Sequence, residues 1–123
     1  MSERFAILHH RLPDGEHWDL MLEGEQALLT WQLPRDPTVP GPWPLPARRI
    51  GDHRKAYLTY EGPVSRNRGT VRRVDGGLLE WIERGPAEFV FRLEGSRLVG
   101  TFRLTAEQGS EASWSLTPLP TPV

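Results

Sequence analysis

Short segments of alternating apolar and polar residues run through this chain. In residues 17–23, Trp18, Leu20 and Leu22 share one face, whereas Asp19 and Met21 share the other, which is the period of a half-buried β-strand. We expect further strands at residues 4–11, 27–33, 48–53, 69–74, 78–83, 88–93, 98–104 and 112–116. No segment keeps a helical apolar period of about 3.6 residues. The pattern therefore predicts an all-β fold with little helix, a single antiparallel β-barrel.

Turn-forming sequences separate these segments. Residues 12–16 contain Pro-Asp-Gly, and residues 75–77, 84–86 and 94–96 contain glycine, so each predicts a hairpin. Residues 34–46 hold six of the twelve prolines, which predicts a surface loop pinned by Trp43. Residues 56–60 fit a short strand or a strand plus turn, and residues 117–123 are expected to be a frayed tail. The tryptophans at 31, 81 and 114 are expected in the core.

Length and composition limit the class of protein. With 123 residues the chain suffices for a single domain, here residues 1–123, and without cysteine it has neither disulfides nor thiolate metal sites. The first residues lack a signal-peptide apolar region, and no apolar run reaches membrane-spanning length. We therefore expect a cytoplasmic monomer that does not associate with membranes.

The polar face of residues 17–23 carries candidate metal chemistry. His17 and Asp19 lie two positions apart, on the same side of the strand. The turn at 12–16 folds the preceding strand back, so that His9 or His10 comes close to His17. Two imidazoles and a carboxylate make a three-ligand metal site with open coordination positions. The alternative is an ordinary surface His-x-Asp pair.

Basic residues are concentrated in the middle of the chain. Residues 48–73 hold eight basic and two acidic residues, whereas the whole chain holds 15 basic and 16 acidic ones. A basic segment in an otherwise acidic chain suits a localised phosphate-binding surface, and a solvated strand face is the alternative.

Several motifs follow one another in a characteristic order from residue 5 to about residue 114. They are Phe-Ala-Ile-Leu-His-His at 5–10, His-Trp-Asp-Leu-Met-Leu-Glu at 17–23, Thr-Trp-Gln-Leu-Pro-Arg at 30–35, Asp52-His53 with Tyr57, Glu61-Gly62, Gly-Thr-Val at 69–71 and Leu-Val-Gly-Thr-Phe-Arg-Leu at 98–104. Each motif alone is weakly specific. Their ordered series resembles the 3'-phosphoesterase module of bacterial DNA ligase D, in a free-standing small form.

The resemblance implies a Mn²⁺-dependent phosphoesterase that trims 3'-phosphate or 3'-ribonucleotide ends of DNA during repair. It implies His10, His17 and Asp19 as manganese ligands, with His9 as the fallback for His10, and His53 and Tyr57 as catalytic residues at the phosphate. Candidate phosphate-binding cations are Arg49, Arg54, Arg66 and Arg68, and Arg48 and Arg72 are further candidates for contacts to the nucleic-acid backbone. The implied partners are DNA or RNA-tipped DNA 3' ends and a DNA ligase or polymerase of repair.

Two departures from the family pattern affect the expected activity. Met21 occupies the position of the usual arginine, and residues 63–68 shorten a loop that is usually rich in glycine and glutamate. We expect Met21 at the rim of the metal site and slow turnover, unless Arg66 or Arg68 supplies the missing charge. The alternatives are a module that binds nucleic-acid ends or a repair partner without hydrolysis, and a metal-binding barrel acting on a phosphorylated metabolite.

Overall fold

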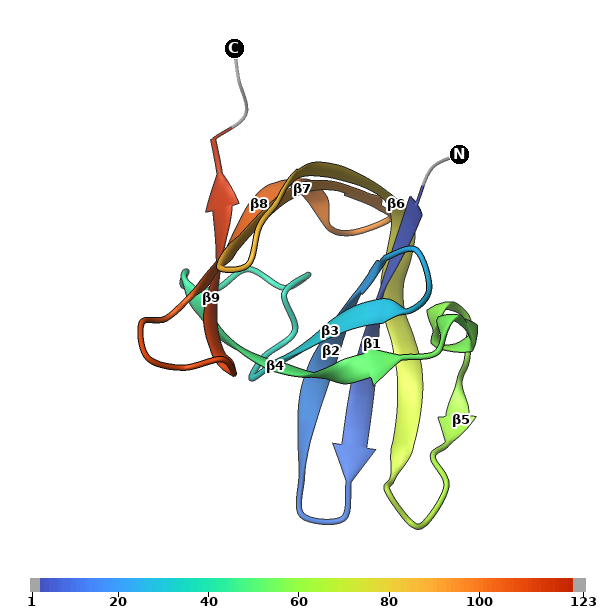
Figure 1. Cartoon of the computed structure of the whole chain (residues 1–123). Coiled ribbons are helices and arrows are strands. Elements are labelled where there is room, and N and C mark those ends of the chain that lie inside the picture. The colour runs from blue at the N-terminus through green and yellow to red at the C-terminus, as the bar shows by residue number, and fades with distance from the viewer. Residues whose placement is uncertain (1–2, 121–123) are drawn as a thin grey trace.

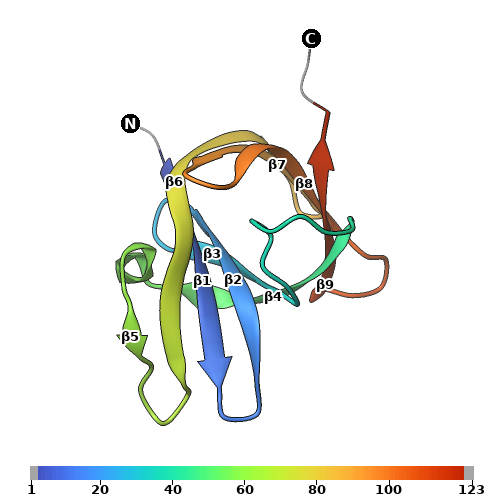
Figure 2. The ribbon, with the colours of Figure 1, turned by 180° about the vertical axis from the view of Figure 1, so that it is seen from behind.

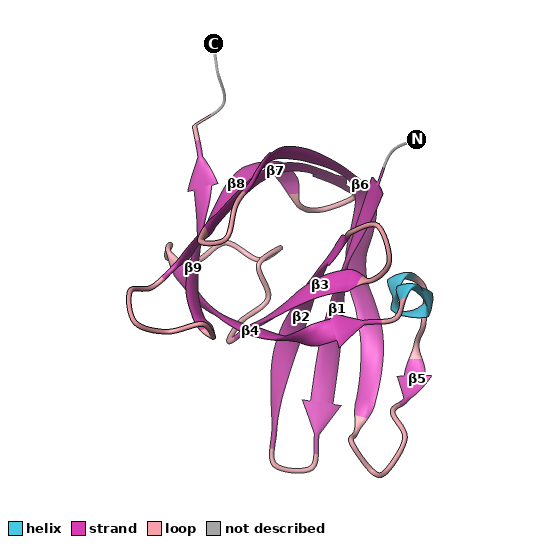
Figure 3. Cartoon of the chain, in the orientation of Figure 1, coloured by secondary structure: helices cyan, strands magenta, loops and turns pink. Residues whose placement is uncertain are grey.

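Antiparallel strands make up most of residues 3–120, the part of the chain that the computed structural model describes (Figures 1 and 3). The strands are β1 (Glu3–Leu12), β2 (Gly15–Glu23), β3 (Leu28–Leu33), β4 (Leu45–His53), β5 (Gly62–Pro63), β6 (Thr70–Arg84), β7 (Glu88–Gly95), β8 (Val99–Ala106) and β9 (Ser113–Leu119). They pair in the order β1-β2-β3-β4-β9-β8-β7-β6, and β1 also pairs with β6, which closes the barrel. The all-β barrel prediction is therefore confirmed. β5 pairs with β6 outside this ring.

The longest strand, β6, corrects the hairpin predicted at residues 75–77. Its first part pairs with β1 and its last part with β7, so the chain bends here instead of reversing (Figure 2). The bend requires glycine, because a Cβ on Gly77 would lie 2.1 Å from the Glu94 carbonyl oxygen. The buried Asp75 carboxylate accepts hydrogen bonds from the backbone N–H groups of Ser96, Arg97 and Leu98, at 2.9, 3.1 and 2.7 Å. The Asp-Gly-Gly sequence is thus a barrel corner.

Three other segments differ from the sequence-based prediction. Residues 55–58 form a 3-10 helix, η1 (Lys55–Leu58), where a strand was expected at 56–60. β4 begins at Leu45, inside the predicted proline-rich loop of residues 34–46. Residues 117–119 are paired with β8 and are not frayed, whereas 121–123 of the predicted tail lie outside the described residues. Pro118 is tolerated there because the pairing of β9 with β4 ends at Leu116, so no ladder on that side needs its missing N–H.

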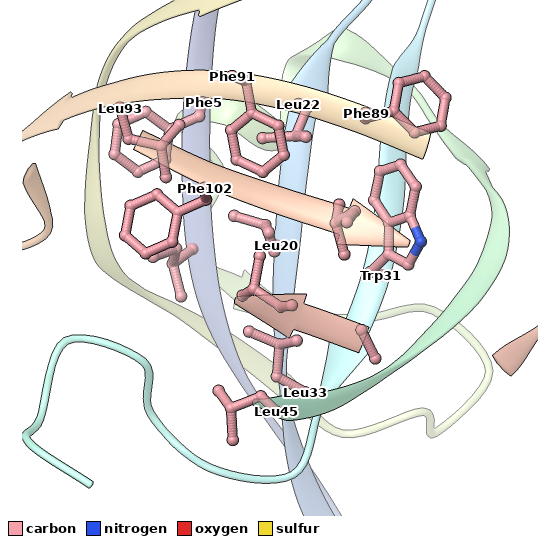
Figure 4. Packing of buried hydrophobic residues seen from close by; sticks show 14 of the residues in the cluster. Phe5, Leu20, Leu22, Trp31, Leu33, Leu45, Phe89, Phe91, Leu93 and Phe102 are labelled. Atoms are coloured by element: carbon pink, nitrogen blue, oxygen red, sulfur yellow. The ribbon is translucent and has the colours of Figure 1, made fainter. Parts of the chain in front are cut away.

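The main core fills the barrel (Figure 4). Alternation along β1 and β2 directs Phe5, Leu20 and Leu22 inward, where they join residues of the other strands such as Phe91 and Phe102. As expected, Trp31 and Trp114 are buried in this core, and Trp81 packs against it half-buried. Residues 3–120 include no helix that is long and apolar enough to cross a membrane.

A second apolar cluster lies on the outer face of the wall, and its buried members are Ala6, Leu8, Met21, Leu28, Leu58 and Val71. Leu58 belongs to η1, and Tyr57, Tyr60 and Val64 pack against the cluster. β1 is therefore buried on both faces over residues 5–8. Beyond this cluster the β1–β2 hairpin and the start of β6 project past β4 (Figure 1).

Candidate metal centre and adjoining polar pocket

Three predicted ligands meet on the outer face of the β1–β2 hairpin. The register places His10 opposite His17 and Leu8 opposite Asp19, so the side chains of His10, His17 and Asp19 share one face. One potential ligand atom from each lies within 4.8 Å of the other two. We call these three residues the ligand cluster. The structure thus brings together the residues that sequence reasoning named.

The histidine rings of the ligand cluster point their Nδ1 atoms toward Asp19. His17 Nδ1 lies 2.8 Å from Asp19 Oδ1, and His10 Nδ1 lies 3.6 Å from Asp19 Oδ2. The Nε2 atoms face away from Asp19: His10 Nε2–H donates to the Arg68 carbonyl at 2.6 Å, and His17 Nε2 lies 3.5 Å from the Gln32 amide. Because the Nε2 proton of His10 is engaged, its neutral ring presents a lone pair at Nδ1.

Two atoms of the cluster are buried without a hydrogen bond. Within residues 3–120, neither His17 Nδ1 nor Asp19 Oδ1 has a hydrogen-bond partner, although the atoms are only 2.8 Å apart. Asp19 is 3% exposed, so water does not readily satisfy its carboxylate. Buried polar atoms are normally paired, and an imidazole nitrogen next to a carboxylate oxygen is a donor set for a divalent cation. The residues present therefore fit the metal that the sequence resemblance implies.

His9 lies on the opposite face of β1. Its ring stacks on Trp18, with 4.5 Å between centroids and 5° between planes, and its Nε2 is 2.6 Å from Glu16 Oε1. Strand alternation therefore points His10 toward Asp19 and His9, the fallback ligand, away from it.

A pocket of about 300 Å³ adjoins the ligand cluster and is lined by Leu8, His10, Asp19, Asp52, His53, Arg54, Tyr57, Val64, Arg68 and Val71. We call it the polar pocket. The predicted catalytic pair lies here, with His53 and Tyr57 edge to face at 5.5 Å between centroids. His53 Nδ1–H donates to the Gly51 carbonyl at 3.0 Å, so the opposite nitrogen, Nε2, is left for another partner.

The formal charges of the arginine and aspartate residues that line the polar pocket balance when no metal is bound. Arg54 and Arg68 bring two positive charges, and Asp19 and Asp52 bring two negative ones. A bound divalent cation would make the pocket strongly positive, as a phosphate dianion requires.

Sequence reasoning missed Asp52 as a pocket residue and Gln32 as the neighbour of His17. Gln32 stands opposite Asp19 on β3, and that register cannot be read from the chain.

Two of the four predicted phosphate-binding cations lie elsewhere. Arg49 is on the inner side of β4, and its guanidinium lies over Trp31, Phe89 and Trp114 at 5.0, 5.5 and 5.6 Å from the ring centroids. Arg66 has a φ of 63° in the exposed turn at residues 65–67 and does not line the pocket. The expectation is thus corrected for both: among the four, the structure brings only Arg54 and Arg68 to the pocket.

Met21 also departs from its expected position. It shares the face of Asp19, but it is 0% exposed and belongs to the outer apolar cluster with Leu58 of η1. It does not line the polar pocket. The expectation that Met21 reaches the rim of the metal site is wrong, because η1 covers this part of the strand.

The chain is similar to a known protein family. The model of the DNA ligase D 3'-phosphoesterase domain matches residues 8–106, a range that contains the ligand cluster and every residue lining the polar pocket. No curated protein matches the sequence.

Proposed function

Because the chain belongs to the DNA ligase D 3'-phosphoesterase domain family, we propose that it is a Mn²⁺-dependent phosphoesterase acting on DNA ends that carry a 3'-phosphate or a 3'-ribonucleotide. The observation that carries this proposal is the shared wall of the ligand cluster and the polar pocket. His10 and Asp19 belong to both, so a phosphate in the pocket is next to the metal position. The cations and acid–base groups of the pocket then surround the same phosphate.

His10, His17 and Asp19 would hold the ion, and the outward hydrogen bond from His10 to the Arg68 carbonyl fixes that ring. When bound, the ion supplies Lewis-acid activation of the phosphoryl group. Arg54 and Arg68 would neutralise the non-bridging oxygens. Protonated His53 would donate from Nε2 to the leaving oxygen, and the Tyr57 hydroxyl would hydrogen-bond the same group.

We expect turnover to be slow. The usual family arginine is replaced by Met21, and the buried thioether neither lines the pocket nor neutralises charge. Of the two loop cations considered as substitutes, Arg68 lines the pocket and Arg66 does not. Arg68 is therefore the candidate for the compensating charge.

The test is incubation of the purified protein and Mn²⁺ with labelled primer-templates that end in a 3'-phosphate or a single 3'-ribonucleotide. A dephosphorylated or shortened strand ending in 3'-OH is the expected product. Asp19→Ala should abolish it, whereas His9→Ala, which changes a histidine on the opposite face, should preserve it. If wild-type protein gives no product with either end under Mn²⁺, the enzymatic proposal is rejected.

A second candidate is a module that binds nucleic-acid ends, or a ligase or polymerase of repair, without hydrolysing them. The replacement of the family arginine by Met21 favours it, because one phosphate-binding cation of the family pattern is missing. An electrophoretic shift of the same primer-template without product would support this candidate over the enzyme.

A further inference from the structure

A row of polar residues crosses the outer face of the barrel, starting from the ligand cluster. Asp19 on β2 stands opposite Gln32 on β3, Gln32 opposite Arg48 on β4, and Arg48 opposite Ser113 on β9. Residues directly opposite in register lie on the same face of a sheet. With about 4.8 Å between neighbouring strands, the Arg48 backbone lies roughly 10 Å from that of Asp19. The row therefore leads away from the metal position, on the side opposite β1.

The row borders a hollow of about 600 Å³, the volume of a typical small-ligand site. Its lining includes His17, Gln32, Arg48 and Ser113, together with apolar side chains such as Pro46. The polar pocket shares His10 and Asp19 with the ligand cluster, and this second hollow shares His17. Residues of the ligand cluster thus line both hollows, and the His17 ring lies between Asp19 and Gln32. We call the second one the side hollow.

Arg48 is exposed at the side hollow, and its guanidinium has no charged or hydrogen-bonding partner among the described residues. Among residues 3–120, no ion pair and no side-chain hydrogen bond uses its guanidinium. The guanidinium of its neighbour Arg49 lies over three aromatic rings. The guanidinium of Arg35 donates to the carbonyls of Val39 and Pro42. Glu107 is the acidic residue that lines the side hollow. A free guanidinium beside a partly apolar hollow suits a ligand with both a phosphate and a neutral, flat part.

We propose that the side hollow binds the terminal nucleoside of the strand whose 3'-phosphate lies in the polar pocket, with Arg48 contacting the next phosphate along that strand. This inference rests on the proposed function and deepens it. A 3'-terminal phosphate is attached to one nucleoside, and that nucleoside must leave the metal position by a route other than the polar pocket. The side hollow is the route that adjoins His17. The substrate class is accordingly a nucleic-acid strand and not an isolated phosphate ester.

The experiment measures binding of a fluorescent oligonucleotide that ends in 3'-OH, the product strand, by anisotropy with Mn²⁺ at several salt concentrations. Because a product is not turned over, this measurement does not depend on catalysis. Arg48→Ala should weaken binding about tenfold, as for loss of one charged hydrogen bond. It should also lower the slope of log Kd against log salt by about 0.7, the value for one phosphate contact on a single strand. Ser113→Trp, which fills the side hollow, should weaken binding similarly.

Arg103→Ala is the matched control, since Arg103 lies on β8 and pairs with Glu88 at 3.3 Å. It should leave affinity and salt slope at the wild-type values. Equal affinity and slope in Arg48→Ala and wild type would overturn the inference, even if the wild type processes 3' ends. Conversely, Arg48-dependent binding without any turnover would uphold the side hollow and reject the proposed enzymatic function.

Discussion

Replacing Met21 by arginine tests whether this position faces the outer core or the metal site. The Met21 side chain is 0% exposed, and the buried members of its cluster are all apolar. Asp19 and Glu23 flank it on the same face of β2, but Asp19 faces two histidines, and Glu23 Oε1 accepts from the Arg4 backbone N–H at 2.8 Å. An arginine at position 21 would therefore have no free carboxylate. We expect Met21→Arg to lower the free energy of unfolding by about 3–5 kcal/mol, the cost of an uncompensated buried charge.

Such a loss is a large share of the roughly 5–15 kcal/mol that stabilises a domain of this kind. Urea unfolding followed by tryptophan fluorescence would show a midpoint lower by about 1–5 M at the usual slope of about 1–3 kcal/mol per M. Met21→Leu is the matched control, and it should cost less than about 1.5 kcal/mol because it keeps volume and apolarity. A Met21→Arg variant that unfolds at the wild-type midpoint and turns over faster would refute the outer-core position of residue 21. That result would place the guanidinium in the polar pocket.

The site and the barrel lead to four further predictions. An alanine substitution of any one residue of the ligand cluster should sharply weaken Mn²⁺ binding in calorimetric titration, whereas His9→Ala should not; loss of binding in His9→Ala alone would show that the other face carries the metal. Wild-type protein at 100 times the Mn²⁺ Kd should gain about 2.7 kcal/mol of stability, and EDTA should remove it. His53→Ala and Tyr57→Phe should each keep Mn²⁺ binding and lower kcat by about 10²–10⁴, so unchanged rates would exclude them from the reaction. Gly77→Ala should cost at least about 1–3 kcal/mol of unfolding free energy, because its Cβ would meet the neighbouring strand at 2.1 Å, whereas Gly15→Ala, with nothing within 4 Å, should be nearly neutral; equal midpoints in urea would contradict this.

Short-range pattern was sufficient for the fold class and for part of the site. The two-residue period specifies strands, and the glycine turns at residues 84–86 and 94–96 do join β6 to β7 and β7 to β8. His17 and Asp19 had to share a face because they are two positions apart on one strand. The ordered motifs were also enough to identify the family, since order along the chain is a property of sequence.

Only the tertiary structure decided what covers each face. Alternation puts Met21 and Asp19 on one side of β2, but η1, from a distant part of the chain, buries Met21 and leaves Asp19 at a pocket. Likewise, alternation predicts that Arg48 and Arg49 point in opposite directions, yet barrel closure is what gives Arg49 its aromatic partners and leaves Arg48 exposed. Gly76 and Gly77 resemble a turn in the sequence. The contact that requires glycine at position 77, 2.1 Å from a Cβ there to the carbonyl oxygen of Glu94 on β7, exists only in the folded barrel. Period and turn chemistry are local properties, whereas register and coverage depend on contacts between residues far apart in the chain.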